Sequence, residues 1–159
     1  MQNKELREKI KAVSWNQVQI TSCSHLVVVL AKVKEIKFGS SYVDKMIARR
    51  ADKDIEAIAA KKKFYNDFLL SNFKNDDELT FQWSHEQCMI AATNMMNAAA
   101  SLGIDSCPIE GFDRHALNEI LGLDESEKRV AIVVPFGYRL NPQPEKYRRQ
   151  RSEVVTWIY

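Results

Sequence analysis

The segment from Asp77 to Leu102 restricts the possible folds of this chain more than any other feature. Its first half carries Leu79, Trp83 and Ile90 at helical spacing. Small or apolar residues then occupy nearly every side of the helix: Cys88 to Ala92, Met95, Met96 and Ala98 to Ala100. Because a helix that is apolar all round must be covered by protein, we predict a long buried core helix, or one buried in a subunit interface. Gly103 supplies the left-handed residue that ends it.

Three further helical segments are predicted. Asn3 is a suitable N-cap for a helix over residues 4–13, and Asp113 caps a short helix over 114–121 that Gly122 stops. A long helical region runs from residue 41 to about Phe73, with an interruption near Asp52–Asp54. Its run of lysines at 61–63 indicates a solvated helix face rather than a binding site. The stretch 14–21 is too polar for a core element.

The strands are predicted from runs of valine, isoleucine and leucine. Residues 25–33 and 129–138 are typical of central strands buried on both faces. Pro135 lacks an N–H donor, so the second strand is expected to bulge or to reach an edge there. Residues 104–111 form a short extended segment, and 153–159 have strong β-propensity that needs a partner edge.

These elements fit one domain over residues 1–159. No glycine-rich turn joins a strand to a helix, which argues against a Rossmann or P-loop nucleotide site. The predicted fold class is α+β, a sandwich with a mixed β-sheet flanked by helices and a long buried core helix. Residues 138–159 form an extended C-terminal arm.

Charge and composition exclude several kinds of partner. The formal net charge is only +2, so nucleic acid is not an expected partner, although lysine and arginine outnumber acidic residues in the arm. The three cysteines form no CxxC pair and the three histidines no ligand spacing, so we expect reduced thiols and no metal. No apolar run suits a membrane span and no signal core opens the chain, so a cytoplasmic protein is expected.

Two stretches of the sequence carry recognisable motifs. The first is Gln87 to Asp113 (QCMIAATNMMNAAASLGIDSCPIEGFD), which ends in PIEGF. The second includes the strand 130–137 and the spacing Lys146-x-Arg148 ahead of Glu153. Both stretches closely resemble the FMN-dependent nitroreductase family, and Asn16-Gln17-Val18-Gln19 resembles its flavin-edge loop. PIEGF after an alanine-rich helix is fairly specific, whereas K-x-R alone means little.

The resemblance implies a homodimeric α+β sandwich with FMN at the subunit interface and the arm crossing to the partner subunit. It implies an NAD(P)H oxidoreductase in which NAD(P)H reduces the flavin and a nitroaromatic, quinone or similar small-molecule acceptor then reoxidises it. No acid, base or nucleophile is required, so no catalytic side chain is named. Phe64 and Tyr65 lie where the family often places substrate-pocket aromatics, but we expect core packing for them.

The resemblance also assigns the cofactor-binding residues, which are Asn16, Gln19, Pro108, Ile109, Glu110, Gly111, Lys146 and Arg148. Main-chain N–H groups around Glu110 and Gly111 would approach the flavin N5 region, with no glycine side chain in the way. Pro108 would hold the turn and Ile109 would pack on the ring face. Asn16 and Gln19 would meet the pyrimidine edge, and Lys146 and Arg148 the phosphate.

Each of these residues also has an ordinary structural interpretation. A Pro-Ile-Glu-Gly turn, loop amides and solvated cations are common in proteins that bind no flavin. Family members usually begin with an Arg-x-Ser-x-Arg phosphate motif, which this sequence lacks, so we expect an N-terminally truncated member. Losing two phosphate ligands would weaken FMN binding by roughly 10²- to 10⁴-fold. The alternative function is therefore a non-catalytic scaffold that binds little or no FMN.

Overall fold

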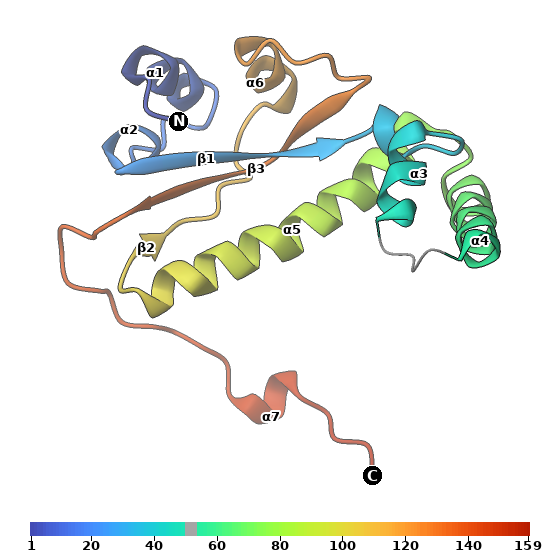
Figure 1. Cartoon of the computed structure of the whole chain (residues 1–159). Coiled ribbons are helices and arrows are strands. Elements are labelled where there is room, and N and C mark those ends of the chain that lie inside the picture. Colours follow the sequence, from blue (N-terminus) through green and yellow to red (C-terminus); the bar gives the residue numbers. More distant parts are fainter. Residues whose placement is uncertain (50–53) are drawn as a thin grey trace.

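The computed structural model describes residues 1–49 and 54–159 (Figure 1). The elements, in chain order, are α1 (Lys4–Ala12), α2 (Gln19–Ser22), β1 (His25–Lys32), the 3-10 helix η1 (Lys34–Ile36), α3 (Ser41–Ala48), α4 (Ile55–Phe73), α5 (Asp77–Ser101), β2 (Asp105–Ser106), α6 (Arg114–Ile120), β3 (Lys128–Gly137) and α7 (Arg151–Val154).

The long helical region predicted from residue 41 onward is divided into α3 and α4. We predicted an interruption near Asp52–Asp54, and the structure shows it at Asp54. The Asp54 carboxylate accepts hydrogen bonds from the Glu56 and Ala57 N–H groups and so caps the start of α4. Asp52 and Lys53 lie outside the described residues.

The sheet has three strands in the order β1-β3-β2, so β3 is central. Both pairings are antiparallel in the described residues. The predicted α+β class is confirmed, but the described sheet is antiparallel and not mixed as we predicted. β1 pairs only with β3 there and its middle residues are half-buried, so the prediction of a second central strand was wrong. The β-bulge in β3 lies at Ala131, between the partners of Val29 and Leu30, rather than at Pro135.

Helices cover the two faces of the sheet, as the predicted sandwich requires (Figure 1). On one face, Ile10 of α1, Ile20 of α2 and Leu117 of α6 pack against sheet residues such as Leu26 and Val133. On the other face, α5 brings residues such as Ala92 against Ile132 and Val134. Ile20 is fully buried, so the stretch 14–21 contributes to the core although we expected it to be too polar.

Helix α5 begins at the predicted residue, ends one residue before the predicted Leu102, and is followed by the predicted Gly103. The Asp76 carboxylate accepts a hydrogen bond from the Leu79 N–H, and Gly103, at a φ of +72°, ends the helix. Only one side of α5 is covered in this single chain, however, since Ile90 is 59% exposed and Met95 is also exposed. The prediction of a helix covered all round is therefore not met within one chain, because the sheet offers it only one packing face.

The C-terminal arm leaves the body of the molecule (Figure 1). Arg139 anchors its start, since the guanidinium and main-chain N–H of Arg139 both donate to the Asp105 carboxylate of β2. These hydrogen bonds, opposed by partial desolvation, hold the pKa of Asp105 below its ordinary value. The predicted strand over 153–159 is absent from the described structure. Here α7 is a short helix and 155–159 are irregular, because this part of the arm extends away from the sheet (Figure 1).

A buried arginine ties the N-terminal helix to the start of β1. Arg7 is only 5% exposed. Its guanidinium donates to the carbonyl oxygens of Cys23 at 2.7 Å, Met1 at 2.6 Å and Ser24 at 3.1 Å. One planar fork thus satisfies three main-chain acceptors from two segments.

We expect Arg7→Ala to lower the free energy of unfolding by about 2–4 kcal/mol, because it removes buried charged hydrogen bonds and leaves carbonyls unpaired. Chemical denaturation measures the effect. Lys9→Ala is the matched control on the same helix. Within residues 1–49 and 54–159, Lys9 forms only an exposed ion pair with Glu5, so its loss should change stability by less than about 0.5 kcal/mol. Equal effects of the two substitutions would contradict the assignment.

Candidate functional site

The turn at 108–111 lies beside the central strand and carries unpaired main-chain donors. Ile109 exchanges both main-chain hydrogen bonds with Val133, at 2.8 and 3.1 Å, which fixes the turn to β3. Pro108 and Glu110 are exposed. Within the described residues, the N–H groups of Glu110 and Gly111 donate no hydrogen bond. Two main-chain donors are therefore available to a ligand at this turn.

The side chain of Ile109 is buried, unlike those of its neighbours Pro108 and Glu110. It is 2% exposed and packs in the core with residues such as Ile10 and Leu117. The expected packing of Ile109 on a ring face is therefore not available in this structure. Alternation along the extended segment explains the difference, because the residue that bridges to Val133 turns its side chain inward.

The structure brings the loop containing Asn16 and Gln19 next to this turn. The side-chain amide of Gln17 donates to the Gly111 carbonyl at 3.1 Å, and the Asp113 N–H donates to the Val13 carbonyl at 2.9 Å. Asn16 and Gln19 are both exposed beside these contacts. Segments almost a hundred residues apart in sequence thus form one surface, and the amide that joins them belongs to Gln17, which we had not singled out.

Trp15 is a second residue of this surface that the sequence did not reveal. A Cβ atom added to Gly111 would lie 2.6 Å from Cε3 of the Trp15 ring. The indole therefore lies against the main chain of Gly111, where only glycine leaves enough room. Trp15 is nevertheless 79% exposed, and Trp15 and Asn16 both have positive φ angles, of 52° and 54°. A tryptophan in a polar stretch was the only sequence signal.

Helix α5 contacts the turn through one side-chain pair. His85 Nε2 lies 3.0 Å from Glu110 Oε1. The histidine is largely covered while the glutamate is about half exposed. This contact restrains the Glu110 side chain from the α5 side.

Lys146 and Arg148 are not brought to the turn within one chain. Both lie in the exposed arm, which leaves the body (Figure 1). Arg148 donates a hydrogen bond to the neighbouring Tyr147 carbonyl at 3.0 Å. We expected these two cations to bind the FMN phosphate. That expectation stays a prediction, because it requires the arm to pack on a surface that it does not contact in this single chain.

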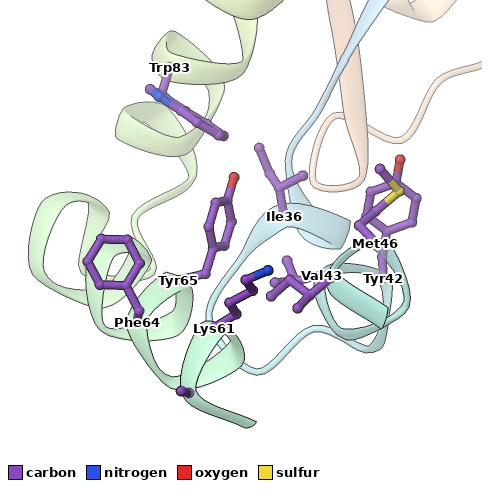
Figure 2. Close-up of a pocket in the computed structure, with 10 residues that line it drawn as sticks. Ile36, Tyr42, Val43, Met46, Lys61, Phe64, Tyr65 and Trp83 are labelled. Atoms are coloured by element: carbon purple, nitrogen blue, oxygen red, sulfur yellow. The ribbon is translucent and has the colours of Figure 1, made fainter. Parts of the chain in front are cut away.

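Phe64 and Tyr65 of α4 line a cavity of about 620 Å³ between α3, α4 and α5 (Figure 2). Phe64 is 73% exposed, so the expected core packing is wrong for this residue. Tyr65 is half-buried, and its ring packs near Phe68.

Other candidate chemistry is limited in the part of the chain that the structure describes. No group of three or more His, Cys, Asp or Glu side chains there is arranged to hold a metal ion. None of the described helices has both the length and the apolar surface needed to cross a bilayer. The three cysteines are half-buried free thiols.

One exposed pair makes stability depend on pH. Protonated His115 donates a hydrogen bond from Nδ1 to the Glu125 carboxylate at 2.6 Å, which raises the pKa of His115 above its ordinary 6.5 and lowers the pKa of Glu125 below 4.5. The contribution of His115 is full below pH 6.5 and is lost as pH rises through its raised pKa. The contribution of Glu125 is lost as pH falls through its lowered pKa.

We therefore expect His115→Gln to lower the thermal midpoint most at about pH 5.5 and to have almost no effect at about pH 9. Both partners are charged at the first pH, whereas the histidine is neutral at the second. Differential scanning calorimetry of both proteins across this range measures the difference. A difference in midpoint that does not change with pH would contradict the expectation.

The structure defines an α+β sandwich in which a long helix covers one sheet face and an exposed Pro-Ile-Glu-Gly turn follows it. Solved structures of this class superpose closely. A nitroreductase-like protein from Streptococcus mutans has a TM-score of 0.83 at 18% identity and covers 100% of this chain and 75% of its own. A protein from Exiguobacterium sibiricum that is classed as a nitroreductase and was solved in complex with FMN has a TM-score of 0.77 at 14% identity. The match covers 98% of this chain and 72% of that protein's chain.

Sequence comparison identifies the family. The nitroreductase family model matches residues 1–138, and the chain belongs to this family. A Staphylococcus saprophyticus protein classed as an NAD(P)H nitroreductase is 41% identical over 99% of this chain and 74% of its own length. A Haemophilus influenzae protein of the same class is 39% identical with the same coverage. The family and the α+β fold that we expected are thus confirmed.

Proposed function

We propose that this protein is an FMN-dependent NAD(P)H oxidoreductase that works as a homodimer and reduces nitroaromatics, quinones or similar small acceptors. The observation that carries the proposal is the pair of unpaired N–H groups at Glu110 and Gly111, beside the loop of Asn16 and Gln19. Relatives classed as NAD(P)H nitroreductases and a similar fold solved with FMN support it.

The described residues fit a flavin at this turn. The N–H groups of Glu110 and Gly111 would donate to the N5 edge, and the amides of Asn16 and Gln19 would meet the pyrimidine edge. FMN, when bound, supplies the hydride chemistry, so the protein needs to bind and orient it rather than to provide an acid or base. The Trp15 indole has to move from Gly111 for this approach, and its high exposure makes that movement inexpensive.

The surfaces that one chain leaves uncovered support a homodimer. The outer side of α5 exposes Ile90 and Met95, and the arm exposes Val154, Trp157 and Ile158. Apolar surface of this extent on a single chain is typical of an interface. We propose that the arm packs on the partner subunit and that Lys146 and Arg148 reach the FMN phosphate in that arrangement.

Titration of the purified chain with FMN tests the proposal directly. Flavin absorbance that stays with the protein after gel filtration, together with NAD(P)H oxidation that requires a nitroaromatic or quinone, is the expected result. Colourless protein that remains inactive with excess FMN would instead support the alternative of a non-catalytic scaffold. In that case the Trp15 indole would remain against Gly111, and its fluorescence would not respond to FMN.

A further inference from the structure

We propose that His85 is a positioning residue for the flavin site and acts through Glu110 on the affinity for oxidised FMN. His85 belongs to α5, and its Nε2 atom lies 3.0 Å from Oε1 of Glu110. An ionised carboxylate can only accept a hydrogen bond, so the imidazole donates one from Nε2. The inference rests on the proposed function, because it concerns the same flavin site. It adds a residue of α5 to a site that we had built only from the turn, the neighbouring loop and the arm.

Main-chain contacts hold the two residues on either side of Glu110. Ile109 exchanges two hydrogen bonds with the central strand β3, and the Gly111 carbonyl accepts one from the Gln17 side chain at 3.1 Å. The Glu110 carbonyl accepts a hydrogen bond from the N–H two residues further along the turn, at 2.9 Å. Within residues 1–49 and 54–159, the hydrogen bond with His85 is the only one that joins Glu110 to another part of the fold. His85 therefore restrains the residue that the other contacts of the turn leave unrestrained.

Glu110 sets the directions of both candidate donors. Its own N–H group belongs to the peptide unit before its Cα atom, and the Gly111 N–H group belongs to the peptide unit after it. Because each peptide unit is planar, φ and ψ of Glu110 decide how these two N–H groups are oriented relative to each other. A side chain that is held at its carboxylate is compatible with fewer combinations of rotamer, φ and ψ. The donors are then ordered before a ligand arrives, which lowers the entropic cost of binding.

The histidine is itself held by the core of the protein. The ring of Phe81, one helical turn earlier on α5, lies 5.8 Å from the His85 ring between centroids. Phe81 is 5% exposed and packs with Ala31 and Ala131 of the sheet. The Arg114 guanidinium covers the Phe81 ring at 5.2 Å. His85 thus offers its donor from a rigid helix whose packing is independent of the turn, as a positioning residue requires.

The two N–H donors distinguish the oxidation states of a flavin. N5 of oxidised flavin accepts a hydrogen bond, whereas N5 of the fully reduced form carries a hydrogen of its own. Hydrogen bonds to ring nitrogens are a means by which a protein tunes its flavin. Loss of the restraint on Glu110 should therefore weaken binding of oxidised FMN and leave binding of reduced FMN nearly unchanged. A contact that served only stability would not change the ratio of the two affinities.

Replacement of His85 by alanine is expected to weaken binding of oxidised FMN about tenfold, which corresponds to the cost of ordering one side chain. Because a tenfold change corresponds to about 30 mV for a two-electron couple, the midpoint potential of bound FMN should rise by that amount. Fluorescence titration measures the affinity, and equilibrium titration against a redox dye measures the potential. His85→Gln keeps an N–H donor and should restore both values toward those of the parent. Gln82→Ala, at an exposed position of the same helix, is the matched control and should change neither.

Two further measurements show whether His85 acts through Glu110. In a protein that already carries Glu110→Ala, the change His85→Ala should have no added effect on FMN affinity, because the contact is already lost. In the protein without FMN, NMR order parameters of the Glu110 and Gly111 N–H groups should fall in His85→Ala and recover in His85→Gln.

The outcomes separate this proposal from the proposed function. If the parent binds FMN but affinity and potential are unchanged in His85→Ala, the role of His85 is wrong and the flavin site stands. Additive effects of the His85 and Glu110 substitutions, or equal weakening of oxidised and reduced FMN, would overturn the role in the same way. A parent protein that bound no FMN would overturn the proposed function, and with it the flavin role of His85.

Discussion

Replacement of Gly111 by valine is expected to weaken FMN binding about 10- to 100-fold, through loss of two main-chain hydrogen bonds and of close approach. The new Cβ atom would lie 2.6 Å from the Trp15 ring and would force the indole aside. The two γ-methyl groups would then cover the N–H groups of Glu110 and Gly111. Fluorescence titration with FMN measures the change.

The apo protein should remain folded in this variant, because the displaced indole is mostly exposed. Its thermal midpoint without FMN is the control, and Gly111→Ala should show a smaller loss of affinity in the same direction. If Gly111→Val bound FMN as tightly as the parent, the flavin would not use this turn, and the proposed site would be wrong.

Removal of residues 142–159 is expected to convert the protein from a dimer to a monomer and to weaken FMN binding by about 10²- to 10⁴-fold. The reason is that the arm supplies both the exposed apolar residues and the two cations proposed for the phosphate. The hydrogen bonds of Tyr147, Arg148 and the Val155 N–H lie within the arm, so the body should still fold. Analytical ultracentrifugation and FMN titration measure the two effects.

Two full-length variants separate these effects. Substitution of Trp157 and Ile158 by serine should disrupt the dimer. Substitution of Lys146 and Arg148 by glutamine should preserve the dimer but weaken FMN binding, because only the charges are lost. A truncated protein that remained dimeric with unchanged FMN affinity would show that the arm has neither role.

Capping residues and apolar runs in the sequence were sufficient to predict helices and strands whose ends are set by residues close to them in the chain. Gly103 ends α5 and Asp113 caps α6 as predicted, because capping depends on residues within three or four positions of the helix end. The β3 strand was predicted because continuous burial requires a continuous apolar run. The motif at 108–111 identified the turn that the structure places beside β3.

The sequence by itself therefore determined the helices α1 and α3 to α6, the central strand, the family and the turn that carries the candidate site, but not the short helices α2 and α7. Only the tertiary structure decided which surfaces meet: the contact of Gln17 with Gly111, the Trp15 ring on Gly111 and the His85–Glu110 pair. These contacts join segments far apart in the chain or depend on side-chain direction. Periodicity and capping report the environment of each segment, but they do not specify its neighbour across the fold.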